Sequence, residues 1–242
     1  MAHFYLNESL ASAEVGGSAE LTGPEAHHAV TVSRVHAGDR LAVGNGAGLL
    51  VTGTVRKAEP AMLTLDVESV TVVQQPAPAI WLAQALAKGD RDELAVQAVT
   101  ELGADGVIPW AASRSVSRWE GAKIAKGHQR WTAIVREATK QSIRAWVPEV
   151  GGLVSTKQLA ALASTTQMLV LDPDADTAIT AIETDTRDVV VVVGPEGGIT
   201  PAELDILGSA GAIPVRLGTT VLRTSTAGPA AVAVLNAKLG RW

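Results

Sequence analysis

The chain has 242 residues, no cysteine, 47% hydrophobic residues, a formal net charge of −5 and a mean hydropathy of +0.20. A chain of this length and hydrophobic content can bury a substantial core, and we expect two ordered domains. The lack of cysteine excludes disulfides, thiolate metal sites and cysteine nucleophiles. No apolar run is long enough for a membrane span, and the first residues lack the order of a secretory signal, so we expect a soluble, cytoplasmic protein.

Residues 1–73 are expected to form a small β-rich domain, because short β-branched runs alternate with glycine turns as in a compact barrel. One short helix interrupts it, with Thr22 as its cap and Pro24 in its first turn. The glycine-rich stretch at 44–48 lies between two β runs with no helix after it, which predicts a hairpin turn and argues against a dinucleotide site. Residues 74–79 carry two prolines and are predicted to be a linker.

Residues 80–242 alternate between strand-like and helix-like patterns. Strands are predicted at 80–86, 106–109, 168–171, 189–193 and 213–217, and helices at 91–102, 119–145, 201–209 and 226–239. This alternation predicts an α/β domain with a mainly parallel sheet covered by helices on both faces.

The most informative segment is VVVVVGPEGGITPAE at 189–203, in which a buried strand stops at a glycine-rich turn and a helix follows at once. Thr200 is predicted to cap that helix, with Pro201 in its first turn and Glu203 completing a capping box. Gly194, Gly197 and Gly198 then lie at the carboxyl end of a strand, where open α/β sheets bind ligands. The alternative is a tight turn without a ligand.

Two further turns support a pocket: one follows the strand at 213–217, and one at 222–227 opens the last helix. Arg223 lies in the last of these turns, where it could hold a phosphate or a developing negative charge, or brace the loops as a structural residue. Glu196 could accept a ligand hydroxyl or amine, or only favour the positive end of the next helix.

Asp90 precedes the helix expected at 91–102 and is interpreted as its N-cap. The five histidines show no metal-ligand spacing, and the sequence contains no HExxH, GxSxG or GxxxxGK[ST] motif. We therefore expect no metal, and zinc hydrolase, serine hydrolase and P-loop functions are disfavoured.

A basic segment at 112–144 stands out in an acidic protein, with eight basic and two acidic residues. Three tryptophans interleave with the charges, and although tryptophan can stack on bases, inward packing is the better interpretation for them. For the charges, an RNA-facing surface is favoured over a plain solvated helix face. The basic residues predicted to bind RNA are Arg114, Arg118, Lys123, Lys126, Arg130, Arg136, Lys140 and Arg144.

Four sequence stretches together resemble the RsmE-type 16S ribosomal RNA (uracil-N3)-methyltransferases of the SPOUT superfamily. They are GPEGG at 194–198 followed by TPAE, LGTTVLRT at 217–224, KGDRDELAVQAVTELGADGVIPWAASRSV at 88–116 and EATKQSIRAWVPEV at 137–150. The resemblance implies an N-terminal PUA-like β-barrel at 1–73 and a SPOUT methyltransferase domain at 80–242 whose last part forms a trefoil knot.

The resemblance also implies S-adenosylmethionine as the cofactor, a homodimer, and the small ribosomal subunit with its 16S ribosomal RNA as the partner. The implied cofactor contacts are Leu171, Pro173, Gly194, Pro195, Glu196, Gly197, Gly198, Leu217, Gly218, Leu222, Arg223 and Thr224. Relatives usually have glutamate at the position of Ser225 and arginine near His3, so the roles of those two positions differ here.

The expected function is therefore S-adenosylmethionine-dependent methylation of N3 of a specific uridine in 16S ribosomal RNA, with Arg223 as the candidate catalytic residue and no general base assigned. The alternatives are a methyltransferase for another RNA position, a non-catalytic RNA-binding or ribosome-assembly protein, and a nucleotide-binding α/β enzyme.

Overall fold

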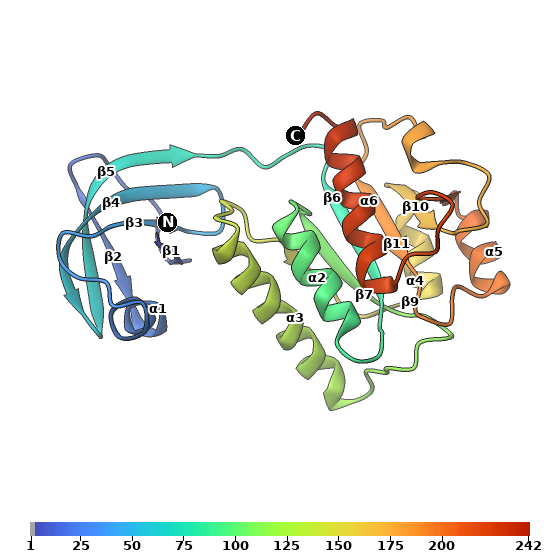
Figure 1. Cartoon of the computed structure of the whole chain (residues 1–242), viewed down its shortest axis with the longest axis horizontal. Helices are drawn as coiled ribbons and strands as arrows, with labels where there is room; N and C mark the ends of the chain where they lie inside the picture. The colour runs from blue at the N-terminus through green and yellow to red at the C-terminus, as the bar shows by residue number, and fades with distance from the viewer. Residues whose placement is uncertain (1–2) are drawn as a thin grey trace. The chain divides into compact units, whose positions relative to one another are not determined.

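The structure is a computed structural model that describes residues 3–242, so the first two residues of the predicted N-terminal domain lie outside the described residues (Figure 1). The chain divides into two compact units: residues 1–75 with Thr139–Val147, and Pro76–Ala138 with Pro148–Trp242. The sequence analysis assigned residues 139–147 to the C-terminal domain. They belong to the first unit because Trp146 Nε1 donates to the Val73 carbonyl at 2.8 Å and Gly48 N donates to the Ala145 carbonyl at 2.9 Å.

The first unit is built on a five-stranded sheet in the order β1 (His3–Leu6), β3 (Arg40–Gly44), β4 (Leu49–Glu59), β5 (Met62–Val72) and β2 (Ser18–Thr22). The β1–β3 pair is parallel and the other pairs are antiparallel. Alternate side chains of the strands point into one hydrophobic core that includes Tyr5, Leu21 and Leu63. The predicted β-rich module is confirmed.

The short helix α1 (Gly23–His27) continues as the π-helical turn η1 (His28–Val32). Pro24 lies in its first turn and Thr22 occupies the N-cap position, both as predicted, but the Thr22 side chain makes no capping hydrogen bond. The hairpin predicted at 44–48 is confirmed, because Asn45 Oδ1 accepts hydrogen bonds from the amides of Ala47 and Leu49 and thereby closes the turn between β3 and β4.

The second unit contains a parallel sheet in the order β12 (Ile213–Val215), β10 (Gln167–Leu171), β11 (Val189–Val193), β6 (Ile80–Ala85), β7 (Gly106–Ala111) and β8 (Glu149–Val150). The short strand β9 (Val154–Ser155) also pairs with β7. All these pairs are parallel, which confirms the predicted α/β class with a mainly parallel sheet.

Helices cover both faces of this sheet (Figure 1). Helices α2 (Arg91–Glu101) and α6 (Thr224–Lys238) pack together against β6 and β11. Helices α4 (Thr156–Leu162) and α5 (Pro201–Ser209) pack together and contribute to a core cluster with Ile108, Trp110 and Val192. The remaining helical elements are α3 (Ala122–Gln141) and the 3-10 turn η2 (Ile179–Ala181).

Some details differ from the sequence analysis. Helix α4 and strands β8 and β9 were not predicted, because each has only seven or two residues. Helix α6 begins at Thr224, two residues before the predicted start. The trefoil knot implied by the resemblance stays a prediction. Within residues 3–242, every helix is too short or too polar to cross a membrane.

Candidate functional site

The second unit contains a cavity of about 570 Å³ at the carboxyl ends of β10, β11 and β12, beside the first turn of α6. This volume is within the range of pockets that hold small molecules and cofactors. Eleven of the twelve residues predicted to contact a cofactor line it, namely Leu171, Pro173, Gly194, Pro195, Glu196, Gly198, Leu217, Gly218, Leu222, Arg223 and Thr224. The structure therefore brings together chain segments that begin at Leu171 and end at Thr224.

Gly197 is the one predicted contact that is not part of the cavity lining. Its carbonyl accepts a hydrogen bond from Nη1 of Arg114 at 2.9 Å, and a β-carbon at Gly197 would lie 3.0 Å from the β-carbon of Arg114. The glycine at this position allows the loop after β7 to approach the turn after β11. Its place in the structure is behind the cavity wall, with the Arg114 side chain.

Local sequence determines the geometry of the glycine turn after β11. The capping box predicted for α5 is confirmed, because Thr200 Oγ1 accepts from the amide of Glu203 and the Glu203 side chain accepts from the amide of Thr200. Gly198 has a φ of 74° and Gly218 a φ of 146°, values that glycine adopts without strain. A side chain at Gly218 would meet no heavy atom within 4 Å, so the backbone there is accessible from the cavity.

Glu203 connects the start of α5 to two other segments of the unit. Its Oε1 accepts from the amide of Ser113 at 2.8 Å and from the hydroxyl of Thr156 at 3.0 Å. Burial acts to raise the pKa of the Glu203 carboxyl, but the hydrogen bonds from Ser113 and Thr200 outweigh it and keep the pKa below the ordinary value. Glu203 is therefore a buried anion that joins the loop after β7, helix α4 and helix α5.

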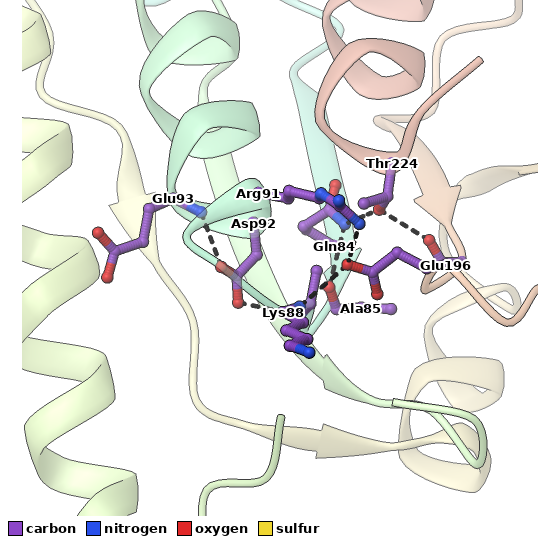
Figure 2. A network of polar contacts seen from close by, with 10 residues as sticks. Gln84, Ala85, Lys88, Arg91, Asp92, Glu93, Glu196 and Thr224 are labelled. Atoms are coloured by element: carbon purple, nitrogen blue, oxygen red, sulfur yellow. Dashed lines mark hydrogen bonds and ion pairs between the residues drawn. The ribbon is translucent and has the colours of Figure 1, made fainter. Parts of the chain in front are cut away.

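Glu196 lies at the cavity rim and is bound to the segment that follows β6. Its Oε1 accepts from the backbone amide of Lys88 at 3.1 Å and from Nη1 of Arg91 at 3.0 Å (Figure 2). Partial burial acts to raise the pKa of Glu196, but hydrogen bonds from backbone amides and Arg91 lower it further and keep the carboxylate ionised. Arg91 itself lines the cavity, a contact that the sequence analysis missed.

A second connection runs from Gln84 at the end of β6 to the cavity. The amide of Gln84 donates to the hydroxyl of Thr224 at 2.8 Å, and that hydroxyl donates to the carbonyl of Gly194 at 2.8 Å (Figure 2). Gln84 was not predicted. The available signal was one uncharged polar residue inside an otherwise apolar strand pattern.

Asp90 occupies the N-cap position of α2, as the sequence analysis assigned it, with a φ of 59° and no capping hydrogen bond from its side chain. Asp92, in the first turn of α2, binds two backbone amides instead: one carboxylate oxygen accepts from the amide of Ala87 and the other from the amide of Glu93. Asp92 is buried, and this burial raises the pKa of its carboxyl above the ordinary value.

Arg223 lines the cavity and is exposed, immediately before α6. It occupies the N-cap position of that helix without a capping hydrogen bond from its side chain. The guanidinium is thus in a position to contact a ligand at the cavity mouth. Ser225 is half-buried in the first turn of the same helix.

The basic residues predicted to bind RNA differ in their surroundings. In the second unit Arg114, Arg118, Lys123 and Lys126 are exposed. Arg130 is also exposed, but it makes a bidentate pair with Glu93 at 2.8 to 3.2 Å that raises the pKa of the guanidinium. Arg136 is half-buried, with Nη1 3.7 Å from a carboxylate oxygen of Glu137.

In the first unit, Arg144 is half-buried and Lys140 is buried. Lys140 Nζ lies 3.1 Å from Oε1 of Glu25, and the two side chains are 8% and 13% exposed. The prediction that Lys140 faces RNA is therefore wrong, because its charge is taken up by an internal ion pair. The sequence pattern placed it on the same helical face as Arg136 but could not show that α1 supplies a carboxylate.

The tryptophans of the basic segment pack inward, as the sequence analysis favoured. Trp131 is buried, and the half-buried Trp119 makes an edge-to-face contact with it at 5.4 Å. Trp119 also lies against Gly127, where a β-carbon would come within 2.3 Å of the indole ring. Across residues 3–242, no group of three or more histidine, aspartate and glutamate side chains could hold a metal ion.

Comparisons with known proteins agree with this architecture. Residues 74–236 match the model of an RNA methyltransferase domain, and residues 21–66 match that of an RNA methyltransferase PUA domain. The chain is 41% identical over 235 residues to ribosomal RNA small subunit methyltransferase E of Mycobacterium bovis, which covers 95% of this chain and 90% of the relative. The chain belongs to the ribosomal RNA small subunit methyltransferase E family. The Bacillus subtilis member of this family is 30% identical over 237 residues, covering 94% of this chain and 93% of the relative.

Solved structures of this family have the same fold. A ribosomal RNA small subunit methyltransferase E from Neisseria gonorrhoeae bound to S-adenosylmethionine is 26% identical, with a TM-score of 0.87 and 98% of both chains covered. A putative methyltransferase from Legionella pneumophila in complex with the same cofactor is 29% identical, with a TM-score of 0.86 and 98% of both chains covered. The N-terminal PUA domain and the α/β methyltransferase fold expected from the sequence are thus confirmed.

Proposed function

We propose that this protein transfers a methyl group from S-adenosylmethionine to N3 of a specific uridine in 16S ribosomal RNA of the small subunit. The observation that carries the proposal is the convergence of three loops, centred on Gly194, Gly218 and Thr224, on one cavity in a chain of this family. Two relatives of the same fold were crystallised with S-adenosylmethionine.

The size and the lining of the cavity fit the cofactor. It is wide enough for a ligand of that size, and its lining includes Gly194, Gly198 and Gly218, where the main chain can approach a ligand closely. The residues proposed to hold the cofactor are the eleven lining residues given above, while Gly197 supports the turn through Arg114. When bound, the cofactor supplies an electrophilic methyl group on a sulfonium.

The chain's own residues would position the two reactants and favour loss of the uracil N3 proton, since holding reactants in line lowers the barrier. The N3 anion of uracil spreads its charge over two carbonyl oxygens, and a guanidinium at the cavity mouth favours such an anion electrostatically. Arg223 is the proposed catalytic residue for this role. Ser225 cannot act as the carboxylate that relatives carry at its position.

We further propose that Arg114, Arg118, Lys123, Lys126, Arg130, Arg136 and Arg144 contact the RNA, with the exposed members making the larger contribution. The proposed organisation is a PUA-like domain at 1–73 that is joined by residues 139–147, a linker at 74–79, and a SPOUT domain with a trefoil knot in the rest of 80–242. The proposed assembly is a homodimer that acts in the cytoplasm, where ribosomal subunits are made.

The test is methyl transfer to small ribosomal subunits that lack the modification, followed by mass-spectrometric mapping of the modified nucleotide. We expect the wild type to add one methyl group at N3 of a single uridine and Arg223→Ala to lower kcat by about a hundredfold, as for removal of one charge-stabilising donor. Arg187→Ala, which removes an exposed arginine paired with Asp185, is the matched control. Methylation at another position would replace the substrate assignment, and an absence of cofactor binding would refute enzymatic activity.

A further inference from the structure

Gln84, a polar residue in the otherwise apolar strand β6, is fully buried in the middle of the parallel sheet. It pairs in register with Val193 of β11 on one side and with Pro109 of β7 on the other, and its exposed fraction is 0%. Burying an uncharged amide costs free energy unless hydrogen bonds replace its lost water. An apolar residue would suit the strand better, so the amide has to be explained by the contacts that it makes.

Those contacts form a series of hydrogen bonds in which the donor and the acceptor of each bond are fixed. Nε2 of Gln84 donates to the Ala85 carbonyl at 3.0 Å and to Thr224 Oγ1 at 2.8 Å. Thr224 Oγ1 in turn lies 2.8 Å from the Gly194 carbonyl. A carbonyl can only accept, so the threonine hydroxyl must donate to Gly194, and the partner facing the hydroxyl oxygen must be a donor. This requirement fixes the orientation of the Gln84 amide.

Gln84 takes part in this series of hydrogen bonds only as a donor. Its Oε1 is buried and has no hydrogen-bond partner in the part of the chain that the structure describes. The two N–H groups of the amide are therefore what distinguishes this residue from a side chain of similar size, such as methionine. A substitution that removes the donor and preserves the volume isolates its role.

This series of hydrogen bonds ends at two of the three loops of the cofactor cavity. Gly194 begins the glycine turn after β11, and Thr224 begins helix α6 directly after the last loop. Both line the cavity, whereas Gln84 does not. Gln84 thus acts on the cavity through Thr224, to which it donates a hydrogen bond and which itself donates to Gly194 (Figure 2).

We propose that Gln84 is a positioning residue that fixes the first turn of α6 against the Gly194 carbonyl and so holds two cofactor loops in the geometry that binds S-adenosylmethionine. The identity of the cofactor rests on the proposed function. The positioning role itself concerns the spacing of the loops and is separate from methyl transfer to RNA.

The principal test is the dissociation constant of S-adenosylmethionine for the full chain, measured by calorimetry without RNA. We expect Gln84→Met to raise Kd about tenfold, which corresponds to about 1.4 kcal/mol. Gln167→Met is the matched control, because Gln167 is also a buried glutamine of the same parallel sheet, with Nε2 donating to the Glu183 carbonyl at 2.7 Å. It lies at the opposite end of β10 from the cavity residue Leu171, so we expect its Kd to be unchanged.

Two more variants separate positioning from general stability. Thr224→Val removes the hydroxyl and should raise Kd as Gln84→Met does, while Thr224→Ser keeps the hydroxyl and should bind the cofactor more tightly than Thr224→Val. Gln84→Glu should bind the cofactor less tightly as the pH rises, because only the protonated carboxyl can donate to Thr224. In turnover, Gln84→Met should raise KM for the cofactor while kcat at saturating cofactor stays within about threefold, because a positioning residue acts on binding.

The proposal is overturned if Gln84→Met binds the cofactor as tightly as the wild type, or if Gln167→Met loses the same affinity. If Gln84→Met does not fold, the comparison of Thr224→Val with Thr224→Ser decides, and equal Kd values for these two would overturn the proposal. Failure of the proposed function would look different, since the wild type itself would then fail to bind S-adenosylmethionine or to methylate ribosomal RNA.

Discussion

Arg91 and Glu196 form an ion pair at the rim of the cofactor cavity, with Nη1 of the arginine 3.0 Å from Oε1 of the glutamate. The pair joins the start of α2 to the glycine turn after β11, and both residues line the cavity. Because the backbone amide of Lys88 donates to the same carboxylate oxygen, Glu196 is held by two donors from the segment after β6. This segment therefore restricts the turn that the cofactor is proposed to contact.

Removing the guanidinium should loosen the glycine turn only moderately. The two side chains are 43% and 25% exposed, so the pair is screened by water and contributes less than about 1 kcal/mol. We expect Arg91→Ala to raise the Kd of S-adenosylmethionine about threefold in calorimetry at low salt, with a smaller effect at high salt. Arg187→Ala, which breaks an exposed pair elsewhere in the same unit, should leave this Kd unchanged.

Gly218 tests the importance of backbone geometry in the second cofactor loop. Its φ of 146° is strained for any residue with a β-carbon, although no atom lies within 4 Å of that position. We expect Gly218→Ala to cost about 1 to 3 kcal/mol of unfolding free energy and to weaken cofactor binding. Gly211→Ala is the control, since Gly211 has a φ of 100° and equally open surroundings at the end of α5. Equal cofactor affinity in the two variants would exclude a role for the Gly218 loop in binding.

The buried ion pair between Lys140 and Glu25 predicts that substitution of Lys140 lowers stability. The sequence analysis had predicted an RNA contact for this lysine. Removing the ammonium group takes a cation 3.1 Å away from the buried carboxylate of Glu25, so Lys140→Met should lower the free energy of unfolding by about 3 kcal/mol in denaturant titrations. The double variant with Glu25→Leu should recover most of this loss, because neither charge then remains buried. A stable Lys140→Met protein with weakened RNA binding would restore the original interpretation.

The exposed lysines of α3 should carry the salt dependence of RNA binding. Each phosphate contact that is lost reduces the slope of log Kd against log salt by about one, so Lys126→Ala should weaken binding uniformly across RNA sequences. Arg130→Ala should have a smaller effect, because its guanidinium is already paired with Glu93. The measurement is a filter-binding series over salt concentration with a fragment of 16S ribosomal RNA. An unchanged slope in Lys126→Ala would remove this lysine from the proposed interface.

Glu203 predicts a loss of stability in acid. The pKa of its carboxyl is lower in the folded protein than in the unfolded chain, so its contribution is present above about pH 4.5 and is lost as the pH falls through the folded-state pKa. Glu203→Gln should be less stable than the wild type at pH 7 by about 1 to 3 kcal/mol. Thermal unfolding from pH 7 to pH 3 should show the two proteins converging in acid. A constant difference over that range would contradict the prediction.

Much of the second unit could be predicted because its signals are local. The valine run at 189–193 and the helix at 201–209 have the predicted bounds, since a β-branched run bounded by glycine and a capping box act within a few residues. The boundary of α6 was less accurate, because Thr224 is held in the helix by Gln84 and Gly194, which are distant in the chain.

The sequence by itself determined the fold class, because glycine turns, helix caps and hydrophobic periodicity depend on neighbouring residues. Its resemblance to known methyltransferases gave the family and eleven of the cavity residues. Only the tertiary structure decided which charged side chains are available to bind a ligand. It paired Lys140 with Glu25 and Arg130 with Glu93, and it placed the amide of Gln84 beside Thr224. The physical reason is that burial and ion pairing depend on segments from distant parts of the chain. A local sequence pattern therefore does not identify the residue with which a side chain will pair.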